Sequence, residues 1–203
     1  MTDIGTLTFG IQIFVTLFVI LDPPGATPIF LSLVGNRSPR ERRYLAWQAA
    51  GVSLFVIASF ALFGRFILDY MHVSMEALQA AGGLLLLYVS LQLLTGATDK
   101  EETKPNTNIG MVPLGTPLLA GPGAIVATMI FVEQANTTGR VLALIAAIVL
   151  VHLIIGGVLS ASTKILSIIK ESGVSLLASI AGLLLAAIAV QMLANAVKAL
   201  AAS

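Results

Sequence analysis

Long apolar stretches alternate with short polar connectors along the whole of the 203-residue chain. Each stretch is apolar on every side, whereas a surface helix of a soluble protein keeps one polar face. An uncharged run of about 18 residues or more can cross the hydrocarbon core of a bilayer. Six such windows are present: Ile4–Leu21, Tyr44–Gly64, Ala77–Thr98, Pro105–Val132, Val141–Thr163 and Ser172–Val197. The pattern predicts an all-α membrane protein with six transmembrane helices.

The composition supports this class and excludes several others. Hydrophobic residues make up 57% of the chain and charged residues 10%, whereas soluble domains carry about 25% charged residues. The longest polar stretch, Thr95–Asn108, is too short for a soluble domain. The chain has no cysteine, which excludes disulfides, thiolate catalysis and cysteine-bound metals. The sequence has no stripe of basic residues, so nothing in it indicates nucleic acid as a partner.

The basic residues predict the orientation in the membrane. Connectors after the first, third and fifth windows carry Arg37, Arg40, Arg42, Arg43, Lys100, Lys104, Lys164 and Lys170. The opposite side carries Arg65, Arg140 and Lys198. Because basic residues gather on the cytoplasmic side, both termini are expected outside the cell. The first residues lack the basic region and cleavage site of a signal peptide, so the first window is expected to stay as a helix.

Three sequence segments recur in the same order at nearly one spacing. PPGA at 23–26 returns as GPGA at 121–124, RFIL at 65–68 as TKIL at 163–166, and GLLLLYVSLQLL at 83–94 as GLLLAAIAVQML at 182–193. We predict two three-helix repeats, 1–98 and 111–203, joined by a cytoplasmic connector, 99–110, within one membrane domain. Because three is odd, the second repeat has the inverted topology that is typical of secondary transporters.

Proline and glycine predict that the first and fourth helices are discontinuous. Asp22, Pro23, Pro24 and Gly25 interrupt the first, and Gly121, Pro122 and Gly123 interrupt the fourth. Proline removes an N–H donor and clashes with the preceding turn, so each helix must break there. Unpaired backbone at membrane depth is tolerated only where it is buried in protein or lines a cavity. Half-helix starts suit a carboxylate and half-helix ends an ammonium group or cation, so together the breaks fit a compact zwitterion.

The expected solute-binding residues lie at these breaks and on the third and sixth helices. They are Asp22, Pro23, Pro24, Gly25, Thr27, Ala120, Gly121, Pro122, Gly123, Ala124, Thr128, Gln92 and Gln191. No catalytic or metal-binding residue and no cofactor is expected; a coupling ion, H⁺ or Na⁺, is left open.

Each polar candidate also has a structural interpretation. Asp22 is the only acidic residue well inside a window, and such residues usually serve ion or substrate paths. It could instead cap the restarted helix. The glutamines could form interhelical hydrogen bonds, and the threonines could bond back to their own helices. His152 is expected to be a satisfied interior histidine, with a proton relay as the alternative. Gly82, Gly83, Gly156 and Gly157 are expected to allow close helix contact.

The segments LDPPGATPIF, AAGGLLLLYVSLQLL, VPLGTPLLAGPGAI and AGLLLAAIAVQML resemble, in order and spacing, signature segments of the MarC family of integral membrane proteins. The family is also called the neutral amino acid transporter family for its SnatA-type members. The resemblance implies a six-helix protein of a bacterial or archaeal inner membrane. Its break motifs fall on Asp22, Pro23, Gly25, Pro28 and Phe30, and on Pro113, Pro117, Gly121, Pro122 and Gly123. It also implies an arginine where this chain has Ser179.

The expected function is secondary transport of small neutral amino acids, such as glycine, alanine or serine, by alternating access. The alternatives are a passive channel for ions or small solutes and a membrane subunit that transports nothing. An intramembrane enzyme is disfavoured, because the sequence has no HExxH motif, no Ser/His/Asp set and no acidic pair. The expected partners are a zwitterionic solute and membrane lipid. A homo-oligomer is left open.

Overall fold

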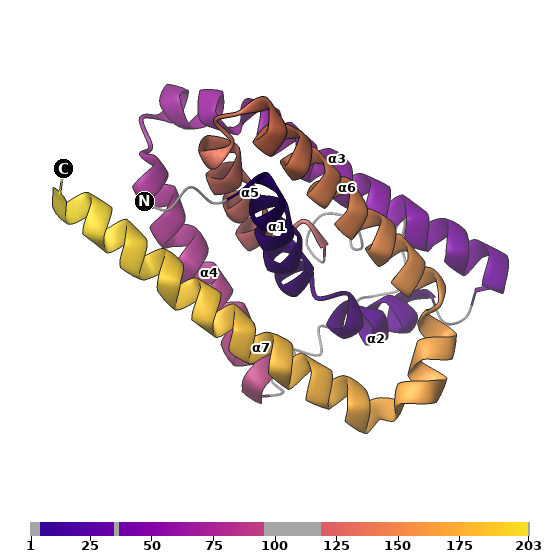
Figure 1. Ribbon diagram of the computed structural model, residues 1–203. Helices are drawn as coiled ribbons and strands as arrows, with labels where there is room; N and C mark the ends of the chain where they lie inside the picture. Colours follow the sequence, from indigo (N-terminus) through magenta and orange to yellow (C-terminus); the bar gives the residue numbers. More distant parts are fainter. Residues whose placement is uncertain (1–4, 35–36, 96–118, 203) are drawn as a thin grey trace.

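The computed structural model describes residues 5–34, 37–95 and 119–202, and its elements there are α-helices (Figure 1). These are α1 Thr6–Leu21, α2 Pro23–Val34, α3 Pro39–Met71, α4 Met75–Thr95, α5 Pro122–Gln134, α6 Thr138–Ser160 and α7 Ser162–Ala202. Five segments are long and apolar enough to cross a membrane: Thr6–Thr27, Pro39–Met71, Met75–Thr95, Thr138–Ser160 and Ser175–Ala201. The chain is therefore a multi-pass α-helical membrane protein.

The predicted fourth span falls largely outside the described residues. Only its end appears, as the 13-residue helix α5. Residues 105–118, which include Pro113 and Pro117 of the second motif, lie outside the described ranges. A sixth span therefore stays a prediction.

Local signals in the sequence explain where two of the helices begin. Ser38 and Glu41 form a reciprocal capping box at the start of α3: Ser38 Oγ accepts the Glu41 N–H, and Glu41 Oε2 accepts the Ser38 N–H. Pro39 follows at the first helical position, where a missing N–H costs nothing. Thr137 caps α6 by accepting the N–H of Arg140. Each cap satisfies a donor that the first turn leaves without an intrahelical partner.

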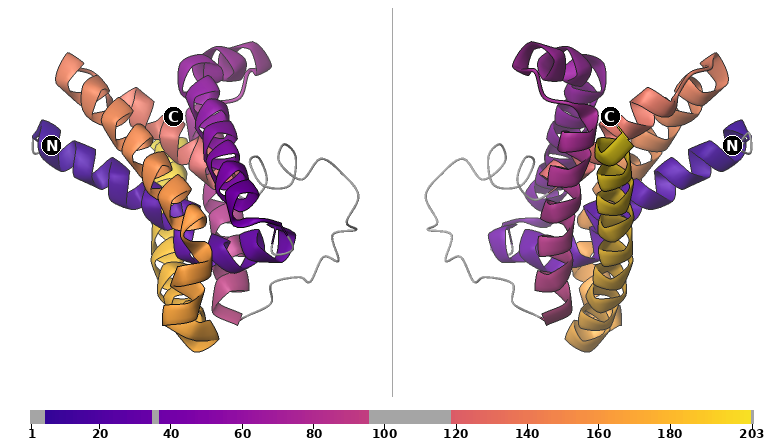
Figure 2. Two further views of the ribbon diagram at one scale, coloured as in Figure 1. Left: turned by 90° about the vertical axis from the view of Figure 1, so that its right-hand side faces the viewer. Right: turned by 90° about the vertical axis from the view of Figure 1, so that its left-hand side faces the viewer.

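The long helices pack in two antiparallel pairs, α3 with α6 and α4 with α7 (Figure 1). The short helices fill the space between these pairs: α2 contacts α6 and α7, and α5 contacts α3 and α4. Helix α1 packs mainly on α6 and also contacts α5. Both chain ends lie in the upper half of the molecule in Figure 1 and Figure 2. We call this the terminal side.

Glycines bring α4 and α7 close together through two equivalent contacts. A Cβ on Gly83 would lie 2.9 Å from Leu193 Cγ and 3.1 Å from the Ala189 carbonyl oxygen. A Cβ on Gly182 would lie 3.1 Å from Leu94 Cγ and 3.2 Å from the Ser90 carbonyl oxygen. The two contacts involve equivalent positions of the two repeated segments, which are 99 residues apart. In the first contact the glycine is on α4, and in the second it is on α7. Small residues of this kind let helix backbones approach in a membrane.

The expectation of close contact is confirmed for three of the four glycines named from the sequence. Gly82 faces Val126 of α5, and a Cβ on Gly156 would lie 2.6 Å from the Trp47 ring. Together with Gly83, these positions have no room for a side chain. Gly157 differs, because nothing stands within 4 Å of its Cβ position. The expectation was wrong there.

The connector expected after the fifth window is helical. Only Ala161 separates α6 from α7, and α7 continues unbroken for 41 residues through Lys164 and Lys170. The charged residues mark where the chain leaves the apolar layer, but lysine is a good helix former and does not end the helix.

Candidate functional site

The first helix breaks at Asp22, as the sequence predicts. Asp22 has the left-handed backbone angles φ 39° and ψ 66°, which turn the chain between α1 and α2. Its N–H still donates to the Phe18 carbonyl at 3.1 Å, so α1 ends normally. Left-handed angles are uncommon for residues other than glycine, and aspartate is among the more tolerant. The break is therefore a defined turn of one residue.

Asp22 caps the helix that restarts. Its Oδ1 accepts the Gly25 N–H at 3.2 Å, and its carbonyl accepts the Ala26 N–H at 2.9 Å. Pro23 and Pro24 have no N–H to offer. The first turn of α2 therefore has no spare donor, and it does not present the carboxylate-binding group expected from the sequence. The capping interpretation of Asp22 is the one that the geometry supports.

The second break is built differently. Helix α5 begins at Pro122 after Gly121, whose carbonyl accepts the N–H groups of Ala124 at 3.0 Å and Ile125 at 3.3 Å. Among the described residues no side chain caps this helix, and Ala120 stands where the first repeat has Asp22. The positive end of the α5 dipole thus lacks the carboxylate that covers the start of α2.

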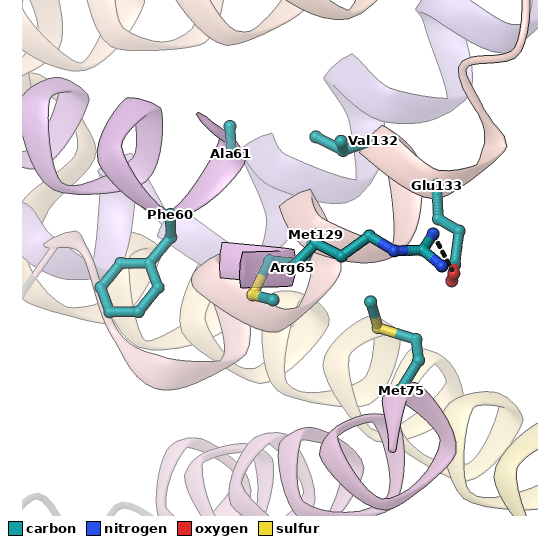
Figure 3. A pocket seen from close by; sticks show the side chains of 7 residues that line it. All are labelled: Phe60, Ala61, Arg65, Met75, Met129, Val132 and Glu133. Carbon is teal, nitrogen blue, oxygen red and sulfur yellow. Dashed lines mark hydrogen bonds and ion pairs between the residues drawn. The ribbon is translucent and has the colours of Figure 1, made fainter. Parts of the chain in front are cut away.

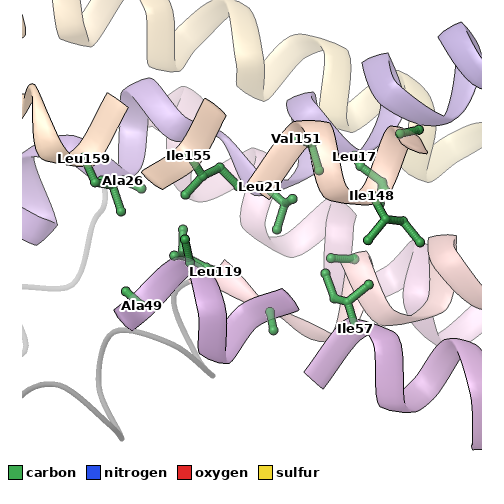
Figure 4. Close-up of a cluster of buried hydrophobic side chains, with 14 of the residues drawn as sticks. Leu17, Leu21, Ala26, Ala49, Ile57, Leu119, Ile148, Val151, Ile155 and Leu159 are labelled. Carbon is green, nitrogen blue, oxygen red and sulfur yellow. The ribbon is translucent and has the colours of Figure 1, made fainter. Parts of the chain in front are cut away.

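Both breaks lie in one buried cluster. Leu21 and Ala26 flank the first break, and Ala120 and Ala124 flank the second; all are at most 5% exposed. Figure 4 shows Leu21, Ala26 and Leu119 facing the residues of α6 that complete this cluster. The structure thus brings the two breaks into the same interior and away from lipid.

The threonines beyond the breaks bond to their own helices. Thr27 Oγ1 donates to the Pro23 carbonyl at 2.9 Å, and Thr128 Oγ1 donates to the Ala124 carbonyl at 2.8 Å. Both side chains are fully buried. This is the alternative left open from the sequence, and it satisfies each hydroxyl donor without a ligand.

A cavity of about 370 Å³ lies between α1, α4, α5 and α7, along the part of α5 from Ala127 to Gln134. Five of its six polar lining residues are carboxamides, Gln12, Gln79, Gln134, Gln191 and Asn195, and the sixth is Thr16. Ala127 of α5, one turn beyond Ala124, forms part of the wall. The cavity lies on the terminal side, because its amides come from the ends of α4, α5 and α7 nearest that side. We call it the amide cavity.

The amide cavity contains one of the two glutamines predicted from the sequence. Gln191 lines it and donates from Nε2 to Asn195 Oδ1 at 2.8 Å. Gln92, at the equivalent position of the first repeat, does not line this cavity. Gln12, Thr16, Gln79, Gln134 and Asn195 were missed. The available signal was a carboxamide inside an otherwise apolar helix, as in FGIQIFV around Gln12.

His152 is a satisfied interior histidine, as expected. Its Nδ1 lies 2.7 Å from the Ile148 carbonyl oxygen, which can only accept, so Nδ1 carries the proton. Its Nε2 lies 3.1 Å from Ser53 Oγ and accepts the hydroxyl proton. The pair joins α6 to α3 in the buried interior.

An ion pair on the surface joins α3 to α5. Arg65 Nη1 lies 3.2 Å from Glu133 Oε1, and both residues border a cavity of about 180 Å³ with Met75 and Met129 (Figure 3). The arginine side chain is 72% exposed, so the pair contributes little to stability. Ser179, the position of the implied arginine, donates to the Ser175 carbonyl at 3.0 Å instead.

Comparison with known proteins agrees with the sequence motifs. The family model for "MarC family integral membrane protein" matches residues 7–201. A UPF0056 membrane protein of Methanocaldococcus jannaschii is 36% identical over 95% of this chain and 97% of its own length. The UPF0056 membrane protein of Aquifex aeolicus is 31% identical over 98% of this chain and 95% of its own. YhcE of Escherichia coli is 27% identical over 92% and 91%. No solved structure matches the chain.

Proposed function

The chain belongs to the MarC family of integral membrane proteins, and from this premise we propose that it is a secondary transporter of small neutral amino acids such as glycine, alanine or serine. The observation that carries the proposal is the amide cavity. Polar side chains are costly among apolar helices and usually serve a solute path. Six polar side chains from four helices converge there on one volume of about 370 Å³.

Carboxamides suit a zwitterion in a membrane. Each offers an acceptor oxygen and two N–H donors, so a set of them can bind an ammonium group and a carboxylate together. Carboxamides are neutral. A charged side chain would instead leave an unpaired charge in the site when no solute is bound. Gln191 donates one N–H to Asn195, which leaves the Gln191 oxygen and the Asn195 amide nitrogen for a solute.

The proposed mechanism needs the six-span, inverted-repeat architecture. It is supported by the antiparallel pairing of α3 with α6 and α4 with α7, and by the exchanged contacts of Gly83 and Gly182. It is also supported by α2 packing on α6 and α7 while α5 packs on α3 and α4. In such folds one repeat rocks against the other around a central site. Asp22 and Gly25 would keep the first break in shape during this motion.

The proposal includes an orientation. The two ends of the chain face the outside of the cytoplasmic membrane, by the distribution of basic residues. The amide cavity then opens outward, and the breaks lie deeper. The solute would pass from the amides to the breaks as the repeats move.

Counterflow in proteoliposomes tests the function. Vesicles loaded with unlabelled glycine, alanine or serine should take up the labelled amino acid faster than empty or protein-free vesicles, and uptake should saturate. Repeating the assay with a proton or sodium gradient identifies the coupling ion. No uptake for the whole set would reject the substrate class. Ion conductance without exchange would favour a channel, and stable copurification with another membrane protein would favour a subunit.

A further inference from the structure

A larger cavity, of about 630 Å³, lies where α3 begins and α6 passes into α7, away from the terminal side. Its lining comes from both places: Pro39, Arg42, Arg43, Trp47, Gly157, Ser160, Ala161, Ser162, Thr163 and Lys164. We propose that this basic cavity binds the phosphate group of an anionic phospholipid. Neither the proposed transport nor the family assigns it a role.

The cavity is positively charged. Arg42, Arg43 and Lys164 line it, and no acidic residue does. The nearest carboxylate along the chain, Glu41, is held in the capping box by the Ser38 N–H and hydroxyl at 2.9 and 2.8 Å. Arg42 Nη1 donates to Thr163 Oγ1 at 3.1 Å and so fixes α3 to the start of α7. Among the described residues no ion pair neutralises Arg43 or Lys164.

A buried donor without a partner lies in the same wall. Ser160 Oγ is inaccessible to solvent and has no hydrogen-bond partner among the described residues. Buried hydroxyls nearly always have one, and this hydroxyl would meet an anionic oxygen in the cavity only after its side chain turns. The charge of the cavity therefore comes from its three basic side chains, which suit an anionic group.

The location indicates a phospholipid as the source of the phosphate. The cavity lies at the ends of two spanning helices, α3 and α6. Trp47 lines it and is 45% exposed, and Tyr44, one turn earlier, is 69% exposed. Exposed tryptophan and tyrosine mark the headgroup level of a bilayer. Basic pockets between membrane helices on the positively charged side are suited to lipid headgroups.

Trp47 is the single tryptophan of the chain, so its fluorescence reports on this cavity alone. The full-length protein is placed in phosphatidylcholine vesicles that contain a minor fraction of brominated phosphatidylglycerol, which quenches tryptophan on contact. Matched vesicles contain the same fraction of brominated phosphatidylcholine. We expect phosphatidylglycerol to quench Trp47 well beyond its share of the lipid. Arg43→Gln and Lys164→Gln should each lower this preference about fivefold.

Arg40→Gln is the matched control, because it removes the same charge from the same end of α3 at a residue that does not line the cavity. It should keep the preference, as should Arg43→Lys. Circular dichroism confirms folding of each variant.

Three results would overturn the proposal. Equal quenching by the two brominated lipids would show that the cavity has no headgroup preference. An equal loss in Arg40→Gln would show diffuse surface charge instead of a site. Inorganic phosphate that shifts Trp47 emission and abolishes the lipid preference would make free phosphate the ligand.

Discussion

The carboxylate of Asp22 occupies the space in which a Cβ of Gly25 would stand, and it accepts the Gly25 N–H at 3.2 Å. The two residues therefore depend on each other: Gly25 leaves room for the Asp22 carboxylate because it has no Cβ, and the carboxylate accepts the Gly25 N–H. This explains why an acidic residue and a glycine flank two prolines at the break.

Substitution of Asp22 separates capping from charge. Asparagine caps helices about as well as aspartate, so Asp22→Asn should keep the thermal stability of the protein. Asp22→Ala should lower the free energy of unfolding by about 1 kcal/mol, because the Gly25 N–H loses its acceptor. Thermal unfolding in detergent measures both. If asparagine is as destabilising as alanine, the charge itself holds the break. Slow counterflow by a stable Asp22→Asn protein would give Asp22 a direct part in transport.

Two neighbouring glycines of α6 should respond to alanine in opposite ways. A Cβ on Gly156 would press on the Trp47 ring at 2.6 Å, so Gly156→Ala should cost about 1–3 kcal/mol and change Trp47 emission. Gly157 has open space around its Cβ position. Gly157→Ala should be neutral or stabilise the helix by up to about 1 kcal/mol. Unfolding and emission spectra of the two variants measure the contrast, and equal effects would contradict the packing described for α3 and α6.

Removing one partner of the Ser53–His152 hydrogen bond should destabilise the protein more than removing both partners. Ser53→Ala leaves the His152 Nε2 buried without a donor and should destabilise the protein by about 1–3 kcal/mol. The double variant Ser53→Ala with His152→Leu removes both polar groups and should recover much of that loss. A double-mutant cycle on unfolding midpoints gives the coupling energy. Additive effects would mean that the two groups do not interact.

Gln191 and Gln92 provide a matched pair for the transport site. They occupy equivalent positions in the two repeated segments, but only Gln191 lines the amide cavity. Gln191→Leu should lower the rate of amino acid counterflow about tenfold, the loss expected from one hydrogen bond to the solute. Gln92→Leu should leave the rate nearly unchanged. The reverse order would place the solute elsewhere.

The sequence predicts the spans and the first break because those depend on local chemistry. Pro23 and Pro24 have no N–H to donate to α1, so α1 ends before them whatever packs around them. The amide cavity depends on packing, since Gln12 and Gln134 are more than a hundred residues apart and nothing in the sequence pairs them. The capping role of Asp22 is only partly predictable. The residue types at the break are compatible with a cap, but only the structure shows which N–H groups the Asp22 oxygens accept. Likewise, Lys164 and Lys170 show where the chain meets water but not that α7 begins at Ser162.

The matching contacts of Gly83 and Gly182 have a consequence for how such a molecule can be assembled. A helix face that packs against an antiparallel copy of itself is self-complementary. Such a face can join two identical chains, provided that they enter the bilayer in opposite directions. The present chain could therefore descend from a shorter ancestor of three helices that paired with a copy of itself. If the chain is divided between residues 96 and 118 and the two fragments are coexpressed, the fragments should still associate through the contact of α4 with α7.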